Sequence, residues 1–273
     1  GRCFTLLNRD QHSWLFPERT IDQRRWYWPL AGAPTSDGTR IALFVVEMHE
    51  GGPHFLSHPI PTRLHRVELD ATTLDVLSTH DESATLPDLY GWTITADGSH
   101  TYLYSHCFQQ FGFDGLLGFG PCAEYLKVAR VPAGAFDAPR EYWNGSAWTR
   151  DHRLATPVVD GTFVMSGNNP AQVLFDRGRF LLIEKRDDWW GTTVEFGVSL
   201  RATGPFERFG SIPEPLACDR STCDTYFASW IPWRDADGSH IWSISCNLWD
   251  GSETCRRLDL YGPTFGTISI PPP

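Results

Sequence analysis

The stretch YGWTITADGSHTYLYSH, residues 90–106, is typical of a β-hairpin. Aromatic and β-branched side chains stand on both sides of Asp97-Gly98, and Asp-Gly between such runs is among the strongest short-range signals for a tight hairpin turn. A close echo, ASWIPWRDADGSHIWSIS, returns at residues 228–245. We therefore expect the fold to use this hairpin more than once.

Two looser copies of the hairpin occur, PTSDGTRIALFVV at 34–46 and VLFDRGRFLLIEK at 173–185. Each of the four hairpins passes through one turn glycine: Gly38, Gly98, Gly178 and Gly238. These glycines are 60, 80 and 60 residues apart, and each hairpin is followed by a second pair of amphipathic strands. Four strands per repeat predict a β-propeller blade. A β-sandwich in which Asp-Gly turns recur by coincidence is the alternative.

The segment before the first hairpin bears on the number of blades. Residues 1–27 contain CFTLLN and SWLFP, which are typical of outer strands of an earlier blade. We therefore expect an all-β protein with a single domain over residues 1–273, a five-bladed β-propeller whose first blade is incomplete. A four-bladed propeller is the alternative, because four repeats fill almost the whole chain.

The composition agrees with short, stiff elements joined by many turns. The chain has 273 residues with 12 tryptophans, 2 methionines, 24 glycines and 20 prolines, a pattern that favours strands over helices. A formal net charge of −10 argues against nucleic acid or an anionic membrane as the main partner, because both need a basic surface. No apolar run reaches the roughly 18 residues of a membrane span. Since the chain begins with Gly rather than Met and lacks a secretory signal, we expect a processed or trimmed form.

Six of the seven cysteines form local pairs that could close disulfide loops. The expected pairs are Cys107 with Cys122, Cys218 with Cys223, and Cys246 with Cys255. Loop-closing pairs of this kind predict an oxidising compartment, whereas zinc binding is less favoured because no C-x-x-C occurs. Cys3 is left over, and we expect its partner in a missing N-terminal segment or a partner chain.

Four stretches together resemble a known family: RRWYWPLAG (24–32), LYGWTITADGSHTYLYS (89–105), VARVPAGAF (128–136) and SGNNPAQVLFDRGRFLLI (166–183). They are similar to secreted actinobacterial five-bladed β-propellers, formerly of unknown function, that include mycobacterial endo-D-arabinanases. The resemblance implies a secreted or cell-envelope protein that hydrolyses a furanose polysaccharide with a pair of carboxylates. The family's Gly-Asp-Ser/Thr strand has no counterpart, because the chain contains no Gly-Asp dipeptide, so no catalytic residue is carried over.

Candidate acids come instead from their positions near the inner strands. Asp88 in PDLYGW and Asp224 in CDTYFASW stand just before the first strand of a hairpin, where the carboxylates of a propeller site are expected. Capping of a turn is the alternative role for both. Glu184 and Asp188 belong to EKRDDWWG, next to two tryptophans. This stretch favours a solvated, Lys/Arg-paired turn over a catalytic role, and Asp188 is retained as the third candidate.

Aromatic and amide side chains supply candidates for sugar binding. Trp28, Trp92 and Trp230 recur at or near the starts of inner strands, where an indole face could stack on a sugar ring. Packing between blades is the alternative. Asn169, before Pro170, could bind hydroxyl groups or form a turn.

These observations give two main hypotheses about function. The first is a secreted, cell-envelope glycan-active protein, an arabinan-type glycoside hydrolase acting through a carboxylate pair in the propeller funnel. The second is a non-catalytic propeller that binds glycan or protein at the cell envelope. Four histidines in EMHEGGPHFLSHPIPTRLH, residues 47–65, indicate a long loop rather than a metal site, and a structural calcium ion is the only cofactor left open.

Overall fold

A computed structural model describes residues 25–50, 59–107, 126–159, 171–186, 193–213, 223–248 and 263–271. At several strand ends only the backbone is described; the side chains outside the description there are those of 25–26, 49–50, 59–60, 107, 223–227 and 246–248. The chain divides into two compact units. One contains strands β1 to β9 and the other contains β10 to β16.

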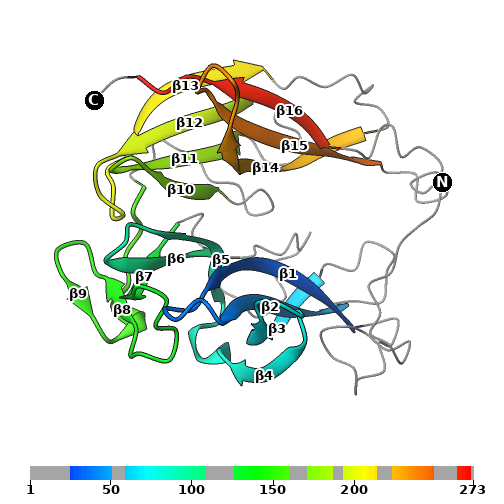
Figure 1. Cartoon of the computed structure of the whole chain (residues 1–273), viewed down its shortest axis with the longest axis vertical. Helices are drawn as coiled ribbons and strands as arrows, with labels where there is room; N and C mark the ends of the chain where they lie inside the picture. Colours follow the sequence, from blue (N-terminus) through cyan, green and yellow to red (C-terminus); the bar gives the residue numbers. More distant parts are fainter. Residues whose placement is uncertain are drawn as a thin grey trace, which may run out of the picture. The chain divides into compact units, whose positions relative to one another are not determined.

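The first unit holds two antiparallel sheets (Figure 1). The first sheet consists of β1 (Arg25–Pro34), β2 (Arg40–Glu50), β3 (Pro59–Asp70) and β4 (Val76–Asp81). The second consists of β5 (Asp88–Ala96), β6 (His100–Cys107), β7 (Val128–Pro132), β8 (Glu141–Trp143) and β9 (Trp148–Thr149). Two 3₁₀ helices, η1 (Ser83–Thr85) and η2 (His152–Leu154), are the described helical elements.

The second unit also holds two antiparallel sheets. One consists of β10 (Gln172–Asp176), β11 (Arg179–Arg186), β12 (Thr193–Ser199) and β13 (Glu207–Pro213). The other consists of β14 (Cys223–Arg234), β15 (His240–Leu248) and β16 (Pro263–Ile268).

In every sheet the strands follow one another in chain order, as the colours within each sheet of Figure 1 show. A twisted antiparallel meander of this kind is a propeller blade, and the fold is an all-β propeller with four blades. This confirms the predicted fold class in its four-bladed form. Residues 1–24, which hold most of the expected remnant of an earlier blade, lie outside the described residues.

The repeated Asp-Gly turns share one hydrogen bond, which explains why aspartate recurs there. In each turn the carboxylate accepts the backbone N–H of the residue two positions later, which fixes the turn before the second strand begins. The three bonds are Thr39 to Asp37 at 3.0 Å, Ser99 to Asp97 at 2.8 Å and Ser239 to Asp237 at 2.8 Å. All four predicted hairpins are therefore present, and the three with Asp-Gly turns are closed in the same way.

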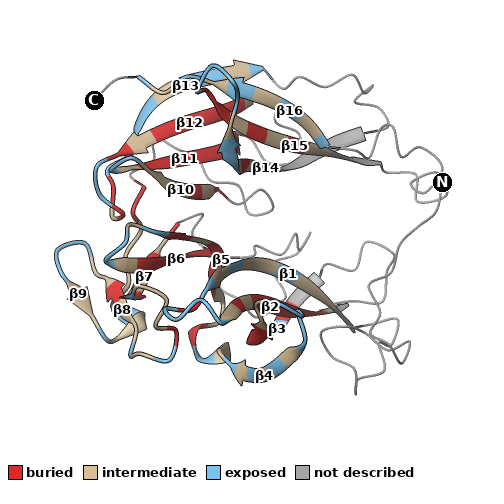
Figure 2. Ribbon diagram, viewed as in Figure 1, coloured by how far each residue is buried: buried red, intermediate tan, exposed pale blue. Residues whose placement is uncertain are grey.

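Apolar residues of the inner strands form the core, as the red segments in Figure 2 show. In the second unit a cluster of buried side chains joins the two sheets through Leu181, Phe196, Trp230 and Trp242. In the first unit the buried strand β2 contributes Phe44, which is fully covered. The inner strands β5 and β11 are buried on both faces, whereas the outer strands β4 and β16 alternate between more and less exposed residues.

Gly91 is expected to be essential for the packing of β5. Its φ is +99°, and a Cβ at this position would lie 2.4 Å from the ring of Phe44. Replacing Gly91 by Ala should lower the free energy of unfolding by about 2–4 kcal/mol, since it combines a left-handed backbone with overpacking. Gly98→Ala is the control, because Gly98 has φ of +89° and a Cβ added there would meet nothing within 4 Å. Urea unfolding that gave both variants equal stability would contradict this account.

Candidate functional site

Of the three acids retained as candidates, Asp88 is the one whose side chain the structure describes. It begins β5, and its carboxylate accepts a hydrogen bond from the Lys127 ammonium at 2.7 Å. The Asp88 side chain is 16% exposed and that of Lys127 is 24% exposed, so the pair reaches the surface of the unit. The side chain is therefore an ion-paired carboxylate at the start of an inner strand, and its catalytic role stays a prediction.

The other two predicted acids cannot be placed in the same way. The backbone of Asp224 lies in β14, opposite Asn247 of β15, and its side chain is outside the description. Asp188 and the predicted sugar-binding Asn169 lie outside the described residues altogether. The disulfides also stay predictions, because all seven cysteine side chains lie outside the described part. These are Cys3, Cys107, Cys122, Cys218, Cys223, Cys246 and Cys255.

The three predicted tryptophans occupy different environments. The Trp230 indole is 7% exposed, belongs to the core cluster of its unit and donates its N–H to the carbonyl of Leu181 at 3.0 Å. Trp92 is 8% exposed and its ring centre lies 4.7 Å from that of His106. Trp28 is partly exposed on β1. Burial of Trp230 and Trp92 favours the packing alternative for these two, whereas Trp28 keeps an accessible surface.

A pair of buried glutamates in the β10–β13 blade is the strongest candidate for acid–base chemistry. Glu184 of β11 and Glu195 of β12 are direct cross-strand partners, so both side chains project from the same face of the sheet. Both residues are 0% exposed. Two carboxylates this close and this dry cannot both be ionised without a large electrostatic cost.

Two arginines divide the charge of this pair unequally. The guanidinium groups of Arg186 and Arg208 lie 3.3 Å and 2.8 Å from the two carboxylate oxygens of Glu195. Neither glutamate forms a regular hydrogen bond with a described residue, so the two arginines compensate Glu195 by charge. The ion pairs of the described residues reach Glu195 and not Glu184, which leaves Glu184 in the environment of a neutral acid.

Burial, and then the negative charge of Glu195, raise the pKa of Glu184 to about 8. A carboxyl group with this pKa holds its proton at neutral pH. A carboxyl whose pKa is raised by burial and a neighbouring acid is a mark of acid–base sites, and buried structural pairs show it too.

The sequence interpretation misses this pair for a local reason. The prediction that Glu184 belongs to a solvated turn is wrong, because the residue lies inside β11 and is fully buried. Glu195 is not among the predicted acids. The signal for both is their apolar surroundings, since FLLIEK and TVEFGV each place a glutamate among residues of a buried strand.

The glutamate pair should make stability depend on pH in a defined direction. The pKa of Glu184 is about 8 in the folded protein and ordinary in the unfolded chain, so between these values the folded protein holds a proton that the unfolded chain has lost. The stabilisation from this proton is complete below about pH 4 and is lost as the pH rises to about 8. Over this range the free energy of unfolding falls by up to about 1.4 kcal/mol per pH unit. Glu184→Gln should remove this slope in urea titrations at several pH values. An unchanged slope in the variant would contradict the assignment.

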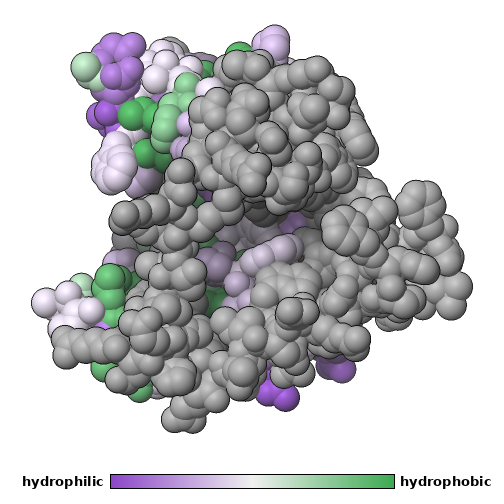
Figure 3. Space-filling view, turned by 90° about the vertical axis from the view of Figure 1, so that its right-hand side faces the viewer, coloured by the Kyte–Doolittle hydropathy of each residue, from purple (hydrophilic) through white to green (hydrophobic). Residues whose placement is uncertain are grey.

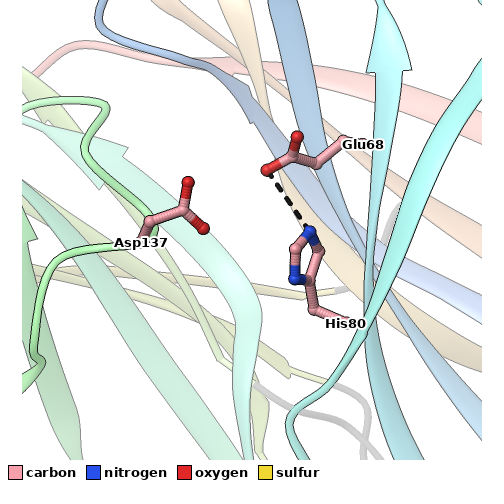
Figure 4. A group of neighbouring side chains, drawn as sticks. All are labelled: Glu68, His80 and Asp137. Carbon is pink, nitrogen blue, oxygen red and sulfur yellow. Dashed lines mark ion pairs between the residues drawn. The ribbon is translucent and has the colours of Figure 1, made fainter.

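A second cluster of ionisable groups lies in the first unit (Figure 4). Glu68, His80 and Asp137 each point a ligand atom toward the others within 4.8 Å, and the His80 ring is 3.7 Å from Glu68. The Arg66 guanidinium already binds Glu68 at 2.9 Å and Asp137 at 2.5 Å, while Arg40 binds the second oxygen of Glu68 at 2.5 Å. Since arginines neutralise the acids, we interpret this cluster as an ion-pair network rather than a metal centre.

The described surface is of mixed polarity (Figure 3), and the described helices are short. The described surface visible in Figure 3 mixes hydrophilic and hydrophobic residues. Within the described residues, no helix has the length and apolar character needed to cross a bilayer.

Comparison with known proteins assigns a family. A family model described as "Domain of unknown function (DUF5005)" matches residues 4–265. The chain belongs to this family. No curated protein matches this DUF5005 chain.

Several solved structures resemble the DUF5005 chain. A protein from Bacteroides ovatus described only as a candidate hydrolase has a TM-score of 0.65 at 17% identity, and the match covers 90% of this chain and 61% of that one. The chain therefore spans less than two thirds of that protein. A GH43_1 enzyme from Xanthomonas citri, solved with xylose, gives 0.48 at 13% identity over 89% and 68% of the two chains. A family 117 glycoside hydrolase from Zobellia galactanivorans gives 0.44 at 13% identity over 91% and 76%. At 17% identity the likeness to the Bacteroides ovatus protein concerns the fold alone.

Proposed function

We propose that the protein is a glycan-active enzyme of the glycoside-hydrolase type. One observation carries the proposal: Glu184 and Glu195 are buried cross-strand partners, and two arginines form ion pairs with Glu195 but not with Glu184, so Glu184 suits a proton donor and Glu195 a charged partner. Hydrolysis of a glycosidic bond by two carboxyl groups requires this division. The fold likeness to the candidate hydrolase from Bacteroides ovatus supports the same reaction class.

In the proposed reaction each member of the pair has one task. Glu184 donates its proton to the glycosidic oxygen as the bond from that oxygen to the anomeric carbon breaks. The negative charge of Glu195, held by Arg186 and Arg208, stabilises the positive charge that develops on the sugar. A water molecule then adds to the anomeric carbon, and the Glu184 carboxylate takes the proton that this water releases, which restores the starting state.

The finer parts of the proposal rest on the sequence resemblance to secreted arabinanases. They are a furanose polysaccharide of the arabinan type as substrate and a secreted or cell-envelope location. Asp88, Asp224 and Asp188 stay candidates for further acids of the site. Asp88 forms an ion pair with Lys127 at 2.7 Å, so this residue suits the stabilisation of charge better than the donation of a proton.

The test is a panel of polysaccharides incubated with the purified chain. Arabinan, galactan and xylan are supplied separately, and new reducing ends are counted, with and without added calcium. We expect release from the arabinan-type polymer. Release from galactan or xylan alone would overturn the substrate class and keep the reaction, whereas no release from any polymer would overturn the reaction.

Glycan binding without hydrolysis is the second candidate function, and one observation favours it. Both carboxyls of the pair are completely buried, whereas a reacting acid must touch its substrate. The same panel separates the two functions when the retardation of the protein in polysaccharide gels is measured beside the reducing ends. Retardation without release would favour the binding protein.

A further inference from the structure

One face of the β5–β9 blade carries a cluster of aromatic and charged side chains that the proposed reaction does not use. Arg130 is the cross-strand partner of both Tyr102 and Glu141, and Trp143 is the partner of Trp148. Cross-strand partners, and residues two apart on one strand, share a face. These five residues of β6 to β9 therefore lie on the same face, and we call them the outer aromatic cluster.

The opposite face of these strands belongs to the core. Leu103, Ala129 and Tyr142 are at most 8% exposed there. In the outer aromatic cluster, the Arg130 side chain is 22% exposed and that of Glu141 is 38% exposed. Trp143 and Trp148 are partly exposed as well. The cluster thus presents its arginine, its glutamate and its two tryptophans to solvent, whereas Tyr102 is buried at 7% exposure.

The geometry of the cluster is fixed by contacts within it. Arg130 donates to the Glu141 carboxylate at 2.8 Å and 2.9 Å, and its guanidinium lies 4.2 Å from the centre of the Trp148 ring. The Trp143 and Trp148 rings meet edge to face at 5.6 Å. Behind them the Tyr102 hydroxyl is held by Asp97 at 2.7 Å. A ligand would meet groups that are already ordered, which lowers the entropic cost of binding.

The chemistry of the cluster selects a neutral, hydroxyl-rich ligand. Glu141 cancels the charge of Arg130, so the site does not favour an anion. The ion pair still offers N–H donors and carboxylate acceptors to neighbouring hydroxyl groups. The partly exposed indole of Trp143 offers an apolar surface beside them, as sugar-binding sites require.

We propose that the outer aromatic cluster is a glycan-binding subsite, separate from the Glu184–Glu195 pair, that holds one or two sugar units of a polysaccharide chain. The assignment to the same polysaccharide as the hydrolase rests on the proposed function. The binding itself does not.

The experiment measures binding in a protein whose hydrolysis is disabled. Glu184→Gln protein is run in native gels that contain arabinan, galactan or xylan, and compared with the same protein carrying Trp143→Ala or Arg130→Met. We expect either second change to weaken binding to the retarding polymer by about tenfold. Trp233→Ala is the control, because Trp233 is 72% exposed and lies in the other unit.

Two outcomes would overturn the subsite. One is equal retardation of the Trp143→Ala and Arg130→Met proteins and their parent, with near-ultraviolet circular dichroism showing all three folded. The other is the absence of retardation of the parent by any of the polymers. Hydrolysis tested separately in the protein with native Glu184 keeps these results distinct from failure of the proposed reaction.

Discussion

Replacing Glu184 by Gln is expected to reduce the release of sugar from the substrate polysaccharide by about 100-fold or more. Glutamine has nearly the shape of the protonated side chain and no proton to give at neutral pH. Since Glu184 is fully buried with a pKa near 8, the change removes the acid but keeps a neutral group at that position. Initial rates of reducing-end formation at neutral pH provide the measurement.

Glu207→Gln is the matched control for this result. Glu207 lies on β13 of the same blade, but it is exposed and is not part of the glutamate pair. It should retain the rate of sugar release. Full activity in the Glu184→Gln protein would contradict the proposed reaction and leave the pair with a structural role.

Replacing Arg66 by Met is expected to lower the free energy of unfolding by about 3–5 kcal/mol. The Arg66 side chain is 4% exposed and binds Glu68 and Asp137 and, at 3.2 Å, Glu82. Methionine preserves much of the volume but leaves the 3%-exposed Glu68 carboxylate with less compensation. Urea or thermal unfolding measures the loss, and the substitution should affect stability far more than sugar release.

Arg153→Met is the control for the Arg66 substitution. Arg153 also pairs with an acid, Asp151 at 2.7 Å, yet its side chain is 79% exposed. Solvent screens such pairs, so we expect no measurable shift of the unfolding midpoint. If the two substitutions had the same small effect, the network around Arg66 would contribute little to the fold.

The repeated hairpins made the fold predictable from the sequence. The Asp97-Gly98 turn and its counterparts depend on a glycine with positive φ and on an aspartate that accepts the backbone N–H two residues later. Since these residues are neighbours in the chain, the turn can be recognised from the sequence. The blade number was harder, because residues 1–27 resemble strands without any marker of the sheet they join.

The candidate site was predictable only in part, for a physical reason. Asp88 could be placed at a strand start because its position depends on its own hairpin. The pairing of Glu184 with Glu195 depends on the register between β11 and β12, across a connection of residues outside the description. A glutamate that follows apolar residues is also compatible with the end of a strand. Only the register between β11 and β12 shows that the Glu184 side chain lies opposite another acid.

The central claim is that one member of the Glu184–Glu195 pair holds a proton at neutral pH. Infrared spectroscopy tests it directly, because the carbonyl stretch of a protonated carboxyl is distinct from that of a carboxylate. We predict a protonated carboxyl that titrates near pH 8, that is present in the Glu207→Gln protein and absent from the Glu184→Gln protein. A spectrum with no carboxyl titrating above about pH 6 would contradict the account.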